Sequence, residues 1–289
     1  MTLQFWYLLP VAILIATTAM ASGVGGATFL SPIFILALGL TPEVAIGTGL
    51  ITEVFGFASG LYAYAKKRLI DYHLGLNLLL FTIPMALLGT WVAGSINPII
   101  LKVILGTGLF FVALSFLRAP EQKDIIHMDT LIEREYGGEK AETCLSTAHD
   151  ERICYTVCNK NEGRLIAGVG GLFVGMISTG LGELNGYFLL QRCRVPSKVS
   201  VATSVFVVAL TALSAAPGHF VRFTQTRIEV LSTVFSIIIF TVPGVIIGAQ
   251  IGSHIASRIT QRKLERALGV LFIIVAALTL GEAAFKKLP

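Results

Sequence analysis

The residues best suited to chemistry lie beside two glycine-rich interruptions of long apolar runs. The first interruption is 22–28 (Ser-Gly-Val-Gly-Gly-Ala-Thr) and the second is 179–186 (Thr-Gly-Leu-Gly-Glu-Leu-Asn-Gly). Glycine lowers helix stability by about 1 kcal/mol relative to alanine, so each interruption should end a helix and expose backbone N–H groups. No Lys or Arg lies in the middle of an apolar run. A small anion would therefore be held by the positive end of a half-helix and by nearby hydroxyls.

The predicted substrate site lies between the two interruptions. Thr48 and Thr203 occupy matching positions in two similar segments, so they are expected to face one ligand as a pair. The alternative is that each threonine bonds a carbonyl of its own helix, and that the glycines serve close helix packing. The predicted substrate-binding residues are Gly25, Gly26, Ala27, Thr28, Thr48, Gly49, Gly182, Asn185, Thr203 and Ser204.

Two acidic residues are the candidates for proton coupling. Glu53 lies near the middle of an apolar segment, where an acid is costly and indicates function. Glu183 takes the place of a glycine in the second interruption. An acid at an anion site repels the ligand unless it is protonated, which suggests that a proton accompanies the anion. The alternative for both is a structural hydrogen bond to an interrupted helix.

The composition defines the elements that must position these residues. Of the 289 residues 54% are hydrophobic and 13% are charged, compared with about 25% charged in soluble domains. Ten apolar segments can be drawn, at about 5–22, 27–40, 43–65, 73–94, 98–117, 165–180, 181–191, 199–219, 228–251 and 264–285. Six of them reach the roughly 20 residues that a membrane-spanning helix needs. The other four form two pairs, each joined at an interruption. The sequence predicts an all-α polytopic membrane protein.

The two halves of the chain resemble each other. Phe-Thr-Ile-Pro at 81–84 recurs as Phe-Thr-Val-Pro at 240–243, and 44–49 recurs as 199–204. Many transporters are built from such repeats. If each short pair enters and leaves on one side, 17 basic residues fall on one side of the membrane and 5 on the other. Because basic residues favour the cytoplasm, this count predicts inverted repeats with both termini outside.

The predicted division is a first transmembrane repeat at 1–117, a cytoplasmic loop or small cap at 118–164, and a second repeat at 165–289. The loop carries 10 acidic and 7 basic residues, and its alternating segment 153–158 predicts a strand or hairpin. A solvated linker is the alternative. All four cysteines lie in regions placed in the cytoplasm, so reduced thiols are expected.

Several functions are excluded by what the sequence lacks. The basic residues lie between apolar runs, which argues against a nucleic-acid surface. The cysteine and histidine spacing matches no usual zinc pattern, and no Walker loop or nucleophile elbow occurs. The chain is therefore predicted to be no enzyme and to need no cofactor or metal. Residues 1–7 lack Lys and Arg, so the first apolar run is expected to be retained rather than cleaved as a signal peptide.

The order of these features resembles the TauE/SafE family of sulfite and organosulfonate exporters. The resemblance spans nearly all of the chain except 118–164. It rests on Gly23-Val24-Gly25-Gly26, Pro32, Gly39, Ala45, Gly47-Thr48, Gly60, Tyr64, Pro84, Gly89 and Thr203-Ser204. It implies a multi-pass transporter of small sulfur-containing or carboxylated anions that uses the proton gradient. The chain departs from the family at Gly182-Glu183, where members commonly have a run of glycines.

These inferences predict a secondary transporter that moves a small sulfur-containing oxyanion, such as sulfite or a sulfonate, across the inner membrane with a proton. The expected partners are the anion, protons and the lipid bilayer, and a homodimer is left open. The alternative is a passive anion channel, or a membrane-embedded interaction protein that acts through 118–164.

Overall fold

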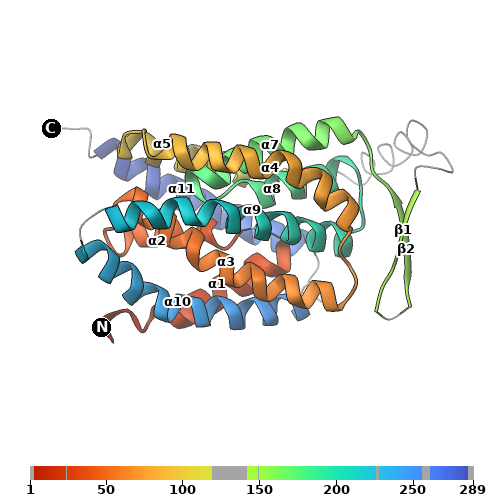
Figure 1. Ribbon diagram of the computed structural model, residues 1–289, viewed down its shortest axis with the longest axis horizontal. Coiled ribbons are helices and arrows are strands. Elements are labelled where there is room, and N and C mark those ends of the chain that lie inside the picture. The colour runs from red at the N-terminus through yellow and green to blue at the C-terminus, as the bar shows by residue number, and fades with distance from the viewer. Residues whose placement is uncertain are drawn as a thin grey trace.

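The computed structural model describes residues 3–23, 25–118, 142–148, 150–225, 228–255 and 261–285. These residues form an elongated bundle of helices with a two-stranded hairpin at one end (Figure 1). η1 and the end of α11 both lie at the end of the bundle that is farthest from the hairpin (Figure 1). Val24 of the first interruption and 119–141 of the predicted loop lie outside the described residues.

The described residues of the first half form five α-helices after a short 3-10 turn. They are η1 (Leu3–Phe5), α1 (Leu8–Ser22), α2 (Ala27–Leu36), α3 (Pro42–Lys66), α4 (Tyr72–Ala93) and α5 (Pro98–Leu117). The hairpin follows, with β1 (Glu142–Ser146) and β2 (Arg152–Thr156). The second half contributes α7 (Lys160–Ile177), α8 (Leu181–Gly186), the π-helical η2 (Tyr187–Arg192), α9 (Ser197–Gln225), α10 (Ile228–Ile255) and α11 (Gln261–Phe285).

Both glycine interruptions end a helix, as the sequence predicts. Gly23 closes α1 with φ 75°, a left-handed conformation that glycine adopts without strain. Ser178 closes α7 with φ 58°, and Gly180 follows with φ 107°. Residues close in sequence also fix where a helix begins. The Asp71 carboxylate caps α4 by accepting from the Leu74 N–H at 2.9 Å. Each short helix, α2 and α8, therefore begins directly after its interruption.

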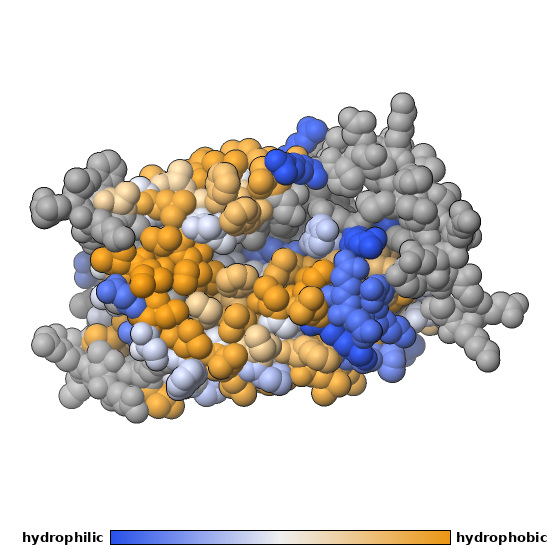
Figure 2. Space-filling view, turned by 90° about the horizontal axis from the view of Figure 1, so that it is seen from above, coloured by the Kyte–Doolittle hydropathy of each residue, from blue (hydrophilic) through white to orange (hydrophobic). Residues whose placement is uncertain are grey.

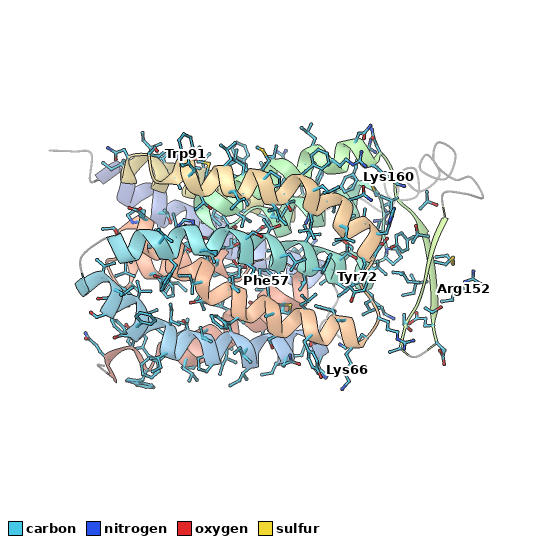
Figure 3. All side chains as sticks on the ribbon, in the orientation of Figure 1. Phe57, Lys66, Tyr72, Trp91, Arg152 and Lys160 are labelled. Carbon is cyan, nitrogen blue, oxygen red and sulfur yellow. A yellow bond between two sulfur atoms is a disulfide. The ribbon has the colours of Figure 1, made fainter. Side chains whose placement is uncertain are left out.

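The outer surface is that of a protein that crosses a membrane. Among the described residues, four helical stretches are long and apolar enough to span a bilayer: Pro42–Lys66, Tyr72–Ala93, Ser197–Val221 and Val230–Ile255. The sequence predicted six, and its other two segments form α5 and α11. Hydrophobic side chains cover the middle of the face in Figure 2, and a hydrophilic band borders them on the right. Trp91, which projects outward in Figure 3, is 69% exposed.

Helices of the two halves pack crosswise. α1 lies along α10, α4 lies along α7, and α5 lies along α11, while α3 contacts both α9 and α10. Glycine allows the closest approaches. A Cβ at Gly89 of α4 would collide with the Leu172 carbonyl oxygen, and one at Gly248 of α10 would collide with that of Ile13. The two halves are thus interlocked.

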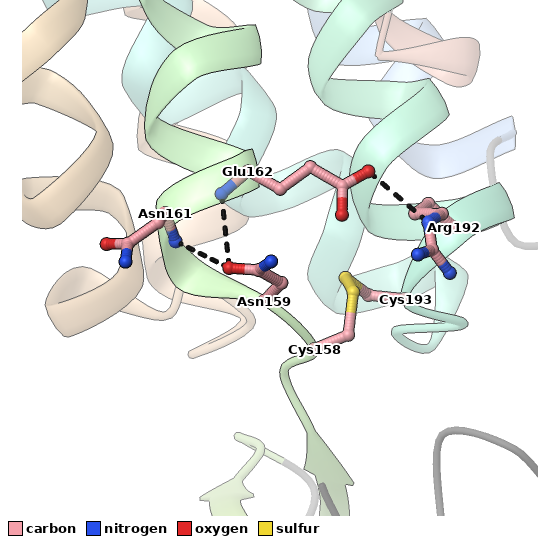
Figure 4. Close-up of polar contacts among 6 residues, drawn as sticks. All are labelled: Cys158, Asn159, Asn161, Glu162, Arg192 and Cys193. Atoms are coloured by element: carbon pink, nitrogen blue, oxygen red, sulfur yellow. Dashed lines mark hydrogen bonds and ion pairs between the residues drawn. A yellow bond between two sulfur atoms is a disulfide. The ribbon is translucent and has the colours of Figure 1, made fainter. Parts of the chain in front are cut away.

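The hairpin corrects one prediction about the cysteines. β1 and β2 pair antiparallel with Cys144 opposite Cys154, and these two form a disulfide. Cys158 forms a second disulfide with Cys193, which follows η2 (Figure 4). The expectation of reduced thiols is therefore wrong for this structure. The register of the hairpin and the path of the chain beside η2 bring the cysteines together, and neither can be inferred from their spacing.

Candidate functional site

The two interruptions lie against each other inside the bundle. Thr28, in the first turn of α2, contacts Thr179 of the second interruption, with 2.5 Å between the hydroxyl oxygens. The Thr28 hydroxyl also donates to Oε1 of Glu183 in α8 at 2.9 Å. All three side chains are at least 95% buried. Thr28 thus forms one polar cluster with two residues that follow it by 151 and 155 positions in the chain.

Glu183 is fully engaged in this cluster. Its Oε1 accepts from Thr28 and, at 3.1 Å, from the Thr179 hydroxyl. Its Oε2 accepts from the Gly180 backbone N–H at 3.0 Å, so the side chain also caps the start of α8. The sequence left open whether Glu183 caps a helix or binds a proton. The capping contact is present, and it comes with a contact to the other half.

Glu53 reaches from α3 to the start of α2. Its carboxyl group interacts with the backbone N–H groups of Ala27 and Gly26. Its Oε1 has no hydrogen-bond partner among the described residues, and the side chain is 5% exposed. A Cβ at Gly25 would lie 2.5 Å from this oxygen, so glycine is needed there to admit the carboxyl group. The N–H groups predicted to hold an anion already hold the carboxyl group of Glu53.

The two carboxyl groups belong to one site. Glu183 lies close enough to Glu53 for the two to interact electrostatically. Phe57, one turn beyond Glu53 on α3, lies about midway along the bundle (Figure 3). The site is therefore far from both ends of the bundle, where a transported ligand would be exchanged with water.

A small cavity of about 20 Å³ adjoins Glu53. This volume holds roughly one water molecule, so a multi-atom anion requires the helices around it to move. The cavity is mostly apolar. Its lining residues are Ala16, Ala19, Met20, Gly26, Leu30, Glu53, Gly56, Phe57 and Val245.

The predicted Thr48 and Thr203 pair makes separate contacts. The Thr48 hydroxyl donates to the Val44 carbonyl of its own helix at 2.6 Å, which is the alternative that the sequence allowed. The Thr203 hydroxyl accepts from the Asp71 N–H at the start of α4, at 3.0 Å. These bonds do not bring the two threonines to one ligand. Gly49 packs against Ser31.

Three further predicted site residues are buried. Gly182 lies in the first turn of α8. The Nδ2 of Asn185 and the Oγ of Ser204 have no hydrogen-bond partner among the described residues. These two polar groups are 1% and 2% exposed. A buried polar atom without a partner costs free energy, so both are suited to contact a ligand or water.

Sequence reasoning missed two hydroxyl pairs near the site. Thr52 of α3 bonds Thr241 of α10 at 3.0 Å, and Thr82 of α4 bonds Thr211 of α9 at 2.8 Å. The offset of 159 residues that relates the two tetrapeptides could have pointed to them. It relates Thr82 to Thr241 and, if extended to α3, Thr52 to Thr211, although the segments 44–49 and 199–204 are related by 155 residues. Each pair joins residues from different halves.

Comparisons with known proteins agree with this architecture. The family model for the sulfite exporter TauE/SafE matches residues 8–279. The chain is 26% identical over 227 residues to the "Probable membrane transporter protein YunE" of Bacillus subtilis (strain 168), covering 76% of this chain and 79% of the relative. No solved structure matches significantly. The family match covers nearly the whole chain, including both interruptions and the helices that carry Glu53 and Glu183, and the chain therefore belongs to the TauE/SafE sulfite exporter family of membrane transporters.

Proposed function

We propose that this transporter moves a small sulfur-containing oxyanion, such as sulfite or a sulfonate, together with a proton across the inner membrane. The observation that carries the proposal is the buried contact of Thr28 with Thr179 and Glu183. It joins the two interrupted helix pairs at one point. Interrupted helices in corresponding places of two halves are typical of transporter binding sites.

A count of hydrogen atoms supports proton binding at Glu183. The oxygens of Thr28, Thr179 and Glu183 Oε1 form a triangle with sides of 2.5, 2.9 and 3.1 Å. Each side needs one hydrogen atom, and each hydroxyl supplies one. The two threonines supply two, so a protonated Glu183 supplies the third and completes a cyclic set of hydrogen bonds. Loss of that proton leaves one side of the triangle without a hydrogen atom.

Glu53 supports the coupling of anion and proton in a different way. Its carboxyl group occupies the N–H groups of Gly26 and Ala27, which are the positive end of α2. A substrate anion that uses the same groups must displace this carboxyl group. Protonation of Glu53 weakens its hold on the N–H groups and removes its repulsion of the anion. Arrival of the anion and uptake of a proton therefore favour each other.

The packing supports two inverted repeats. If the 159-residue offset of the two tetrapeptides is extended to α3 and α9, the Thr52 and Thr241 pair becomes the Thr211 and Thr82 pair, so the two hydrogen bonds exchange. The corresponding helices α3 and α9 run in opposite directions, because α3 ends and α9 begins at the hairpin. Alternating access would then come from one repeat rocking against the other.

The compartment that the hairpin faces is part of the proposal. The basic-residue count places the hairpin end in the cytoplasm, whereas two disulfides favour an oxidising compartment. We adopt the cytoplasmic placement because the count draws on basic residues from several loops. A reporter enzyme that is active only outside the inner membrane should be active when it is fused to the C-terminus. Activity of a reporter that works only inside the cell would show that the orientation is the reverse.

The test is uptake into proteoliposomes driven by an imposed pH gradient, with sulfite, thiosulfate, sulfonates and carboxylates as candidate substrates. Glu183→Gln keeps a hydrogen-bond donor where the proton would be, so the anion should still bind while the pH gradient no longer speeds uptake. Glu53→Gln should also weaken the response to the gradient. If both variants respond like the wild-type protein, the coupling proposal fails. If the wild-type protein transports none of these anions, the substrate class is wrong.

A further inference from the structure

The hairpin is docked on the bundle rather than free in solvent. Its side chains alternate: Cys144, Ser146, Arg152 and Cys154 are exposed on one face. On the other face Leu145, Ile153, Tyr155 and Val157 join the hydrophobic core at the ends of the helices. Arg152 projects away from the helices, and Lys66 and Tyr72 mark the helix ends nearest to the hairpin (Figure 3). One face is thus fixed by packing.

A buried hydrogen bond fastens this inner face to the start of α4. The Tyr155 hydroxyl donates to Oδ2 of Asp71 at 2.7 Å. Oδ1 of Asp71 caps α4, and its backbone N–H donates to the Thr203 hydroxyl of α9. Burial and the neighbouring Asp71 carboxylate raise the pKa of Tyr155, so its hydroxyl stays a donor at physiological pH. One contact therefore connects the hairpin, α4 and α9.

The turn of the hairpin also reaches both halves of the chain. The Ala148 N–H donates to the carbonyl of Lys67, directly after α3, at 3.1 Å. Lys67 in turn donates to the Ser253 carbonyl near the end of α10 at 2.7 Å. Glu151 forms an ion pair with Lys198 of α9 at 3.0 Å. This pair is exposed and contributes little by itself, but it joins the hairpin to the second half.

A covalent attachment completes the arrangement. The Cys158–Cys193 disulfide ties the end of the hairpin segment to the residue that follows η2 (Figure 4). Because η2 continues α8, this disulfide is connected through one helical segment to Glu183. Arg192 bonds Glu162 beside it, at 3.3 Å. The Cys144–Cys154 disulfide differs, since it joins only the two strands to each other.

Beneath the hairpin, the first turns of α9 contain buried polar atoms. Ser200 is 1% exposed, and its Oγ has no hydrogen-bond partner among the described residues, as is also true of Ser204. Water would satisfy both hydroxyls if this end of the bundle were open. Ser200, at the start of α9, is therefore a position whose exposure would report the opening of this end of the bundle.

We propose that the hairpin is a strap that holds this end of the transporter closed. The Tyr155–Asp71 hydrogen bond fastens it, and the Cys158–Cys193 disulfide adds a covalent tie wherever these two cysteines are oxidised. The inference rests on the proposed transport function, because rocking of one half against the other separates the helix ends that the strap joins. Opening toward this side then requires the hairpin to leave at least the Asp71 contact.

The test measures access to Ser200 and does not depend on the substrate. Ser200→Cys is made in the full-length protein with Cys144→Ser and Cys154→Ser, and its reaction rate with a small maleimide is followed in membranes. Tyr155→Phe removes the hydroxyl, and Cys158→Ser with Cys193→Ser removes the covalent tie. Tyr155→Phe should raise the labelling rate about tenfold, as expected when a buried hydrogen bond to a carboxylate is lost. Removal of the disulfide should raise the rate at least as much in oxidised protein, because it releases a covalent constraint.

Controls separate the strap from general loosening. Restoring Cys144 and Cys154 should leave the labelling rate unchanged, because their disulfide does not reach the helices. The variants should elute as single folded species in detergent, and Trp91→Phe at the other end should not change the rate. Equal labelling rates with and without Tyr155→Phe and the Cys158/Cys193 changes would refute the strap. Faster labelling in a protein that transports no tested anion would support the strap and count against the proposed substrate alone.

Discussion

Gly25→Ala tests the fit between Glu53 and the start of α2. The added Cβ would lie 2.5 Å from Glu53 Oε1 and 3.4 Å from the Thr28 hydroxyl. Gly25 is not among the residues with positive φ, so the effect comes from the collision and not from backbone strain. To reach ordinary contact the carboxyl group must retreat by about 0.9 Å, the difference between about 3.4 Å and 2.5 Å, and its bonds to the Gly26 and Ala27 N–H groups break.

The expected cost follows from those bonds. An intramolecular hydrogen bond contributes about 0.5–1.5 kcal/mol, so the loss of the two N–H interactions in Gly25→Ala should lower the free energy of unfolding by about 1–3 kcal/mol. In a Glu53→Ala background the added methyl group meets no carboxyl group, and the same substitution should be nearly neutral. A double-mutant cycle, measured by denaturant titration in detergent, gives the interaction directly.

The neighbouring glycine provides a matched control. A Cβ at Gly26 would meet only Ala19, at 3.9 Å, and its φ of −65° suits any residue. Gly26→Ala should therefore be neutral or stabilise by up to about 1 kcal/mol. If Gly25→Ala costs the same free energy with and without the Glu53 side chain, the proposed placement of Glu53 on the start of α2 is wrong.

Three further predictions concern other parts of the fold. Thr28→Val removes two sides of the oxygen triangle and should abolish the effect of a pH gradient on uptake, whereas Thr28→Ser should retain it; equal behaviour of the two would contradict the proton count. Because the pKa of Tyr155 is raised in the folded protein, its contribution to stability is complete below about pH 10, the pKa of a free tyrosine, and is lost at higher pH. The midpoint of thermal unfolding should therefore fall less steeply at alkaline pH in Tyr155→Phe than in the wild-type protein. Gly89→Ala and Gly248→Ala should each destabilise by several kcal/mol, since both press on a backbone carbonyl, whereas Gly186→Ala, with no atom within 4 Å, should not; a harmless Gly89→Ala would refute the close packing of α4 on α7.

The sequence was informative wherever a local signal determines structure. Glycine runs ended α1 and α7, and alternating apolar residues formed β2, because backbone preference and side-chain periodicity act over a few residues. The prediction that the two interruptions form one site was also useful, since Thr28 and Glu183 are in direct contact.

The partners within the site were harder to predict. A match between two sequence segments pairs residues by position, but it does not show which residues face each other. Thr48 and Thr203 occupy matching positions and bond different helices, whereas Thr52 and Thr241 do not occupy matching positions and are bonded. Because helices of one half pack on helices of the other, matching positions alone do not predict which residues are in contact. The disulfides depend on tertiary contacts in the same way.

The crosswise packing of helices also bears on how the chain is made. α1 packs on α10, so it meets its main partner only after more than two hundred further residues have been synthesised. Until then the face of α1 that packs on the glycines of α10 can contact only lipid or the insertion machinery. The most extensive helix contacts join the two halves, so the two halves expressed as separate polypeptides in one membrane should assemble with each other and not fold alone. Insertion and folding are therefore separate events in this protein, and folding waits for the last helices.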